Sequence, residues 1–123
     1  MKLIIAGSRG ITDIDTLIKA ISCYDLKDKI TEIVSGTALG ADRLGEIYAE
    51  MNNIKLTKFP ADWKHYPRSA GYKRNLEMSV YGDALLALWD GKSRGTKHMI
   101  NVSQKKKMLV HVYNINSPPM FRV

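Results

Sequence analysis

Two arginines of this 123-residue chain, Arg9 and Arg74, have neighbours that suit the binding of a phosphate group. Arg9 follows Gly7 and Ser8, and Arg74 precedes Asn75, so all five residues are candidates for contact with a ligand. A guanidinium binds phosphate oxygens through two parallel N–H donors, and two converging arginines would clamp such a group. Each arginine taken singly also fits a solvated surface position.

Two glycine-containing turns add backbone and hydroxyl donors. They span residues 36–42 and 90–96, and a helical pattern follows each. Free N–H groups at a helix start favour an anion, although the same residues also fit simple helix caps. The ligand-binding candidates in these turns are Gly36, Thr37, Gly40, Gly91, Ser93, Arg94, Gly95 and Thr96. Neither turn has the G-x-G-x-x-G or G-x-x-x-x-G-K-[ST] spacing, which disfavours an NAD-dependent dehydrogenase or an ordinary ATPase.

Three carboxylates are candidates for contact with a sugar or a water molecule. Asp42 lies in the first turn of its predicted helix, where it either suits ribose hydroxyls or only stabilises the helix dipole. Glu46 is four residues later on the same helix face, and Glu77 is close to Arg74 in the chain. Cleavage of an N-glycosidic bond passes through an oxocarbenium-like transition state, which a nearby carboxylate stabilises. The catalytic candidates are therefore Arg74, Glu46 and Glu77.

Aromatic and basic residues gather in the irregular segment 60–71 and just after the predicted strands. Trp63 and Tyr72 are candidates for stacking on a nucleobase. The formal net charge of +7 favours an acidic partner, which is a nucleotide, a nucleic acid or a membrane surface. The position of the basic residues after strands favours a phosphate-bearing ligand among these.

The elements that must position these residues alternate along the chain. Short apolar runs predict strands at Lys2–Ala6, Glu32–Ser35, Lys55–Phe59, Asp83–Trp89 and Met108–Val112. Amphipathic spacing predicts helices near residues 14–21, 44–51, 70–81 and 95–106, with Ile18 and Met51 counted in the buried stripes. This alternation predicts an α/β fold, a Rossmann-like three-layer sandwich with a mainly parallel five-stranded sheet. The turns after the strands then meet at the carboxyl edge of the sheet, where ligands bind.

The length predicts one domain, residues 1–112, followed by an extended C-terminal tail, residues 113–123. A single cysteine, Cys23, excludes an internal disulfide and fits a reducing cytoplasm. The N-terminal apolar run is too short for a signal peptide, and no apolar run is long enough for a membrane span. His65, His98 and Cys23 lack metal-ligand spacing, so we expect neither a metal nor a cofactor.

Five segments resemble the YspA/YpsA-related branch of the SLOG superfamily, which joins the Smf/DprA DNA-processing proteins to the Lonely Guy (LOG) phosphoribohydrolases. They are Gly7-Ser8-Arg9, Ser35-Gly36-Thr37-Ala38-x-Gly40-Ala41-Asp42, Phe59-Pro60-Ala61-Asp62-Trp63, Ala70-Gly71-Tyr72-x-Arg74-Asn75-x-x-Met78 and Trp89-Asp90-Gly91-x-Ser93-x-Gly95-Thr96. The resemblance covers most of the chain, roughly residues 1–112. It implies a Rossmann-like fold, a pocket for nucleotides or nucleotide-derived ligands, and a homo-oligomer.

The LOG enzymes cleave the N-glycosidic bond of nucleoside 5′-monophosphates, and their Arg-Lys-x-x-Met helix supplies a catalytic arginine. The segment that begins at Arg74 is similar, and residues 91–96 resemble the phosphate-binding turn of these enzymes. Met99 and Ile100 stand where that turn's catalytic glutamate is expected. The resemblance therefore leaves ligand sensing and hydrolysis both open. The net charge and the kinship to DprA give an alternative function, the binding of single-stranded nucleic acid.

Overall fold

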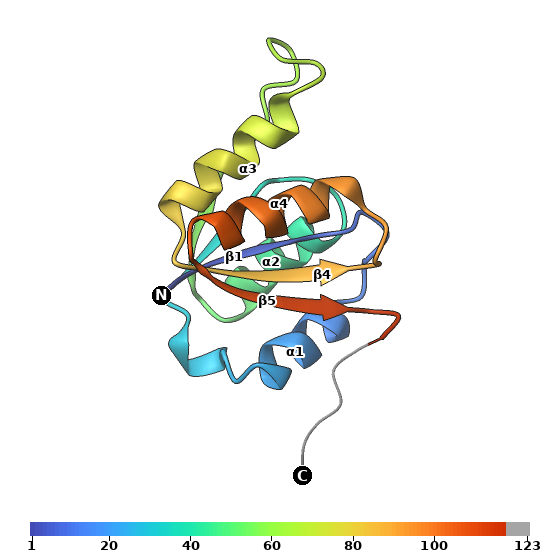
Figure 1. Ribbon diagram of the computed structural model, residues 1–123. Coiled ribbons are helices and arrows are strands. Elements are labelled where there is room, and N and C mark those ends of the chain that lie inside the picture. The colour runs from blue at the N-terminus through green and yellow to red at the C-terminus, as the bar shows by residue number, and fades with distance from the viewer. Residues whose placement is uncertain (118–123) are drawn as a thin grey trace.

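The computed structural model describes residues 1–117, which form a five-stranded sheet with helices on both faces (Figure 1). The strands are β1 (Lys2–Gly7), β2 (Glu32–Ser35), β3 (Lys55–Lys58), β4 (Ala84–Trp89) and β5 (Leu109–Asn114). The helices are α1 (Ile14–Cys23), α2 (Ala41–Met51), α3 (Ala70–Tyr81) and α4 (Arg94–Lys105), with a short 3₁₀ helix at Lys27–Lys29. All strand pairs are parallel, in the order β3-β2-β1-β4-β5. The predicted Rossmann-like α/β fold is therefore confirmed.

Two apolar cores lie on the two faces of the sheet, because successive side chains of a strand point to opposite sides. Leu3 and Ile5 of β1 pack with α1 and α2, whereas Ile4 and Ala6 pack with α3 and α4. Strand β4 alternates in the same way, and its residue Leu86 is fully buried. The central strands are thus covered on both faces, as their continuous apolar runs predict.

Two helix positions that the apolar stripes place in the core are exposed in the structure. Ile18 of α1 is 40% exposed and Met51 of α2 is 61% exposed, so these two predictions are wrong. Both residues line one surface cleft formed by α1, the 3₁₀ helix and α2, so this edge of each stripe faces solvent. Strand β5 extends through Asn114, and residues 118–123 of the predicted tail lie outside the described part of the chain.

The loops after β1 and β2 approach each other so closely that Gly40 has no room for a side chain. Its φ is +77°, and a Cβ atom there would lie 2.4 Å from the carbonyl oxygen of Arg9 and 2.5 Å from that of Ser8. The backbone N–H of Ala41 donates to the same Ser8 oxygen at 3.3 Å. Glycine tolerates both the positive φ and the contact, and it thereby brings two ligand-binding candidate segments together.

Candidate functional site

A cleft of about 440 Å³ opens where β1, β2 and β4 end, and α3 contributes to its lining. It receives residues from four loops that are far apart in the sequence, as the parallel topology requires. The sequence-predicted residues that line it are Gly7, Ser8, Arg9, Asp42, Trp63, Tyr72, Arg74, Asn75, Ser93, Gly95 and Thr96. Its volume falls within the ordinary range for small-molecule sites.

Arg74 crosses the cleft from α3 to the turn after β2. Its Nη1 donates to the carbonyl oxygen of Gly36 at 2.6 Å, and its Nε donates to Asn75 Oδ1 at 3.2 Å. A Cβ atom on Gly36 would lie 2.8 Å from both Arg74 Cδ and Asp42 Oδ2. The absence of a side chain at Gly36 therefore lets the guanidinium approach the turn beside the carboxylate.

Asp42 is a buried carboxylate in the first turn of α2, only 4% exposed. Its Oδ2 accepts the backbone N–H of Ala38 at 3.1 Å. Burial raises the pKa of Asp42 to about 6, although the Ala38 donor and the positive charges of Arg74 and Arg9 act in the opposite direction. Burial lowers the pKa of the Arg74 guanidinium, and the negative charge of Asp42 partly offsets this decrease. The cleft thus contains a carboxylate that changes charge near neutral pH.

Asn75 connects Arg74 to helix α4 and uses its whole amide in doing so. Its Oδ1 accepts from Arg74, and its Nδ2 donates to the Gly95 carbonyl at 3.3 Å and lies 3.1 Å from His98 Nδ1. The side chain is 4% exposed. Asn75 therefore lines the cleft, and its bonds are those of a residue that positions its neighbours.

Asp90 organises the turn between β4 and α4 through hydrogen bonds to its backbone. Its Oδ1 accepts the backbone N–H groups of Ser93 and Lys92, both at 2.8 Å, and these donors hold the pKa of Asp90 below its ordinary value. Ser93 caps α4, since its Oγ accepts from the backbone N–H and the hydroxyl of Thr96. The cap is therefore observed, and Ser93, Gly95 and Thr96 at this helix start also line the cleft.

Aromatic side chains form the outer rim of the cleft. The Tyr72 ring packs on the His98 imidazole with 4.3 Å between ring centroids, and burial with the nearby charge of Lys105 lowers the pKa of His98. Trp63 comes from the loop before α3, which projects from the body of the molecule in Figure 1. A Cβ atom on Gly71 would lie 3.3 Å from the Trp63 ring. Both aromatic candidates are about half exposed.

A second cleft of about 290 Å³ adjoins the first. It receives Gly36 and Thr37 from the turn after β2, together with Leu39 and Ala61. Arg9, Ala38, Trp63 and Arg74 line both clefts. The remaining ligand-binding candidates line neither cleft: Gly40 supports the loop contact described above, while Gly91 and Arg94 are exposed on the turn before α4 and at its start.

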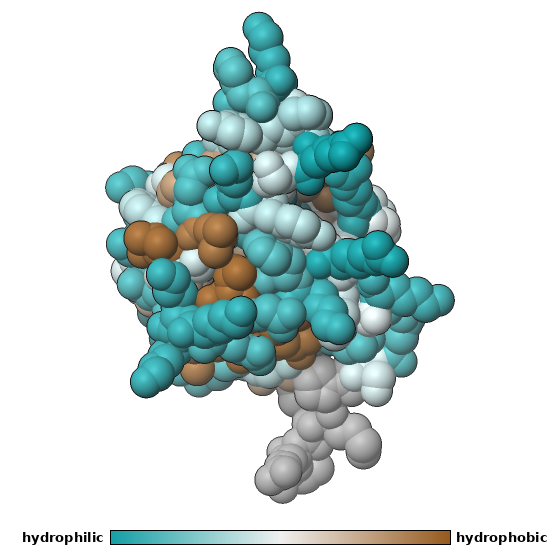
Figure 2. Space-filling view, turned by 45° about the horizontal axis from the view of Figure 1, so that its top comes forward, coloured by the Kyte–Doolittle hydropathy of each residue, from teal (hydrophilic) through white to brown (hydrophobic). Residues whose placement is uncertain are grey.

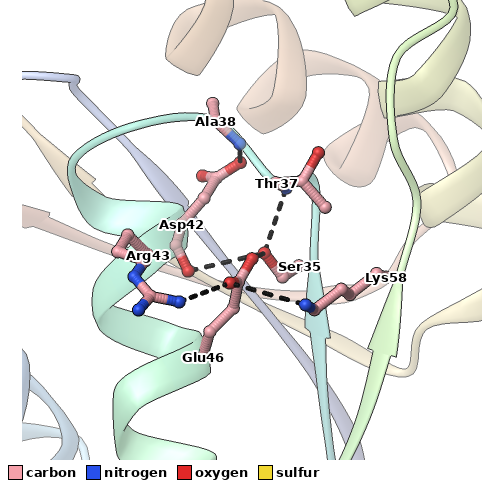
Figure 3. A network of polar contacts seen from close by, with 7 residues as sticks. All are labelled: Ser35, Thr37, Ala38, Asp42, Arg43, Glu46 and Lys58. Carbon is pink, nitrogen blue, oxygen red and sulfur yellow. Dashed lines mark hydrogen bonds and ion pairs between the residues drawn. The ribbon is translucent and has the colours of Figure 1, made fainter.

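The structure does not bring Glu46 or Glu77 to the cleft. Glu46 is one helical turn after Asp42 and points away from the site, where its Oε2 accepts the Ser35 hydroxyl at 2.7 Å and its Oε1 pairs with Arg43 at 3.2 Å and Lys58 at 4.0 Å (Figure 3). Glu77 lies on the exposed side of α3. Ser35 in turn accepts the Thr37 N–H at 3.1 Å, so Glu46 supports the turn that ends in Asp42.

Replacing Glu46 tests this supporting role. We expect Glu46→Gln to change the free energy of unfolding by less than about 1 kcal/mol, because the amide oxygen still accepts from Ser35 and the two lost ion pairs have exposed cationic partners. Glu46→Ala leaves the buried Ser35 hydroxyl without this acceptor and should cost about 1–3 kcal/mol. Urea denaturation measures both. Equal destabilisation by the two variants would contradict the account.

Sequence reasoning missed several residues of the cleft. Ala6, Met78 and Met99 form its buried apolar floor, and Gly10, Ala38, Gly71 and Asp90 complete its wall. Met99 resembles an ordinary core residue in the sequence, whereas Met78 belongs to the segment that resembles the arginine helix of the LOG enzymes. Ala38 contributes a backbone N–H, which no residue type signals. Asp90 carried a signal in retrospect, since an aspartate that follows a strand and precedes Gly91 commonly organises a turn.

Three further features bear on the kind of site. Among residues 1–117, no three His, Cys, Asp or Glu side chains gather closely enough to hold a metal ion. Within the same residues, no helix combines the length and the apolar character that crossing a membrane requires. The face of the molecule in Figure 2 is mostly hydrophilic, and its largest group of hydrophobic residues lies left of the centre.

Comparisons with known proteins agree with the fold and the loop sequences. The model of the YspA, cpYpsA-related SLOG family matches residues 1–66, which include the turns after β1 and β2 and the loop with Trp63. The Gene 61 protein of Mycobacterium phage D29 is 34% identical over 116 residues, an alignment that covers 85% of this chain and 89% of the phage protein. The chain therefore belongs to the YspA, cpYpsA-related SLOG family.

Proposed function

We propose that this protein binds a nucleotide or a nucleotide-derived ligand in the 440 Å³ cleft. Membership of the SLOG family suggests a nucleotide-related ligand. The observation that carries the proposal is the convergence of Arg9, Arg74 and a buried Asp42 beside the N-terminus of α4. Together these groups offer cationic, hydroxyl and N–H donors for phosphate, and a carboxylate acceptor for hydroxyl groups.

The phosphate is assigned to the region between the guanidinium of Arg74 and the start of α4, which Asn75 connects. Ser93, Gly95 and Thr96 line the cleft there, and the helix dipole favours an anion. The guanidinium of Arg74 is fixed by Gly36 and Asn75 on two of its five donors, which leaves the others for phosphate oxygens. Because the guanidinium is already held in place, little side-chain entropy is lost when the ligand binds.

The sugar and the base are assigned to Asp42 and to the aromatic rim. A phosphate close to Asp42 would be repelled by its carboxylate, whereas ribose hydroxyls donate to it. Trp63 and Tyr72 line the cleft and are about half exposed, which suits stacking on a base of any identity.

Hydrolysis of the N-glycosidic bond is a second candidate, favoured by the position of Asp42 beside Arg74 in the cleft. Glu46 and Glu77 lie outside the cleft, and the Oδ1 atom of Asp90 is occupied by backbone N–H groups. Asp42 is therefore the carboxylate placed to stabilise an oxocarbenium-like transition state. In this reaction water adds to C1′ of the ribose, and the base leaves with a proton.

A single experiment separates these functions. We expect isothermal titration calorimetry with AMP, GMP, CMP and UMP to give saturable binding, and chromatography of the same mixtures to show whether free base and ribose 5-phosphate form. Intact ligand would make the protein a sensor, and base release would make it a hydrolase. No binding of any nucleotide, together with binding of oligonucleotides that weakens steeply with salt, would replace the proposal by single-stranded nucleic-acid binding.

A further inference from the structure

The two neighbouring clefts meet at a boundary that carries both arginines. A residue that lines both clefts lies between them, and Arg9, Arg74, Ala38 and Trp63 do so. We infer that the ligand is a two-lobed nucleotide, in which a diphosphate bridge at Arg9 and Arg74 joins one lobe in the larger cleft to a second lobe in the smaller cleft. This inference rests on the proposed function and names the class of nucleotide.

The path of the Arg74 side chain places its charge at this boundary. The side chain starts on α3 in the larger cleft, passes over Gly36, and bonds to the Gly36 carbonyl at 2.6 Å. Gly36 lines only the smaller cleft. The guanidinium therefore reaches from one cleft to the other, and a phosphate bound to it is accessible from both sides.

The lining of the smaller cleft suits an uncharged lobe. Besides the shared residues it consists of Gly36, Thr37, Leu39 and Ala61, none of which is charged. Leu39 is 73% exposed, although it is a large apolar residue next to a ligand-binding candidate segment. The Trp63 ring provides a flat surface at the boundary. A sugar or a base fits such a lining better than a terminal phosphate does, because the lining has no charge to pair with phosphate beyond the two arginines.

Charge at the boundary also favours a bridging group. Arg9 and Arg74 bring two positive charges, and among residues 1–117 neither forms an ion pair within 4.0 Å, although Asp42 is close enough to influence the pKa of Arg74. The two phosphates of a diphosphate bridge supply one negative charge each and can contact one guanidinium each. A terminal monophosphate on the α4 side leaves the smaller cleft to solvent.

The test compares two ligands of equal charge. At pH 8, AMP and P1,P2-di(adenosine-5′) diphosphate both carry a charge of about −2, so a difference in affinity does not come from net charge. We expect the diphosphate to bind the wild-type protein at least tenfold more tightly than AMP by calorimetry. Ala61→Trp and Leu39→Trp, which fill the smaller cleft, should remove this gain and leave the AMP affinity unchanged, whereas Ala61→Ser should keep it.

Each outcome has a distinct meaning. Equal affinity of the two ligands for the wild-type protein would overturn the two-lobed ligand and leave the proposed nucleotide function intact. Loss of AMP binding in both tryptophan variants, with Ala61→Ser unaffected, would also overturn it, because the two clefts would then act as one. Absence of binding of the diphosphate and of all four nucleoside monophosphates to the wild-type protein would refute the proposed function itself.

Discussion

Asp42→Asn is expected to make the protein more stable at pH 8, with a rise in melting temperature of about 5–10 °C. Asp42 is 4% exposed, and burial raises its pKa to about 6, against about 3.9 for an aspartate in an unfolded chain. This difference corresponds to a cost on the order of 3 kcal/mol for the ionised carboxylate in the native state. Asparagine is uncharged, and its Oδ1 can still accept the Ala38 N–H.

The pH dependence of stability gives the sign of this effect. A folded-state pKa above the unfolded value means that the native state binds the proton more tightly. The contribution of Asp42 to stability is therefore greatest below about pH 4, falls as the pH rises to about 6, and stays low above that. Thermal denaturation from pH 4 to pH 8 should show this fall: the melting temperature of the wild type should decrease relative to that of Asp42→Asn as the pH rises. A less stable Asp42→Asn protein at pH 8 would mean that attraction to Arg74 exceeds the cost of burial.

Arg74→Ala should lower the affinity for a nucleoside monophosphate about 100-fold or more. The substitution removes charge-assisted hydrogen bonds to phosphate, each typically contributing about 1.5–3 kcal/mol, and 1.4 kcal/mol is a tenfold change in affinity. Arg74→Lys keeps the charge but loses the planar donor pair and the bond to Asn75, so we expect an intermediate loss. Calorimetry with AMP measures all three proteins.

Arg68→Ala is the matched control for Arg74→Ala. Arg68 is an exposed arginine in the loop before α3, and it lines neither cleft. The two substitutions change the net charge equally, so a site-specific role predicts that Arg68→Ala binds AMP like the wild type. Equal losses would indicate that the overall positive charge attracts the ligand, and would favour binding of nucleic acid along the basic surface.

Most of the fold follows from local patterns in the sequence. The predicted strand Glu32–Ser35 and the predicted helix at residues 70–81 have the observed bounds. Strand runs and helix stripes are local signals, and the parallel orientation of the strands follows from the alternation of strands and helices. The exposure of Ile18 and Met51 depends on how two helices meet on the same face of the sheet. The way in which the two helices meet is a tertiary property, which helical spacing alone does not specify.

The site was harder to predict than the fold, and Glu46 shows why. Helical spacing correctly places Glu46 on the same side of α2 as Asp42, since residues four apart share a face. One turn along the axis is about 5.4 Å, which takes Glu46 below the cleft and into contact with Ser35. Asn75 is the opposite case. It lies in the cleft as predicted, but its three bonding partners come from two helices, and no sequence pattern reveals them.

The empty position at Gly36 has a consequence for the evolution of related proteins. Any side chain there would collide with Arg74 Cδ and Asp42 Oδ2, so the glycine and the arginine are constrained together. A relative that acquires alanine at this position must displace the guanidinium, and selection on that arginine then weakens. We therefore expect the two positions to covary, with glycine marking those relatives in which the arginine still spans the two clefts.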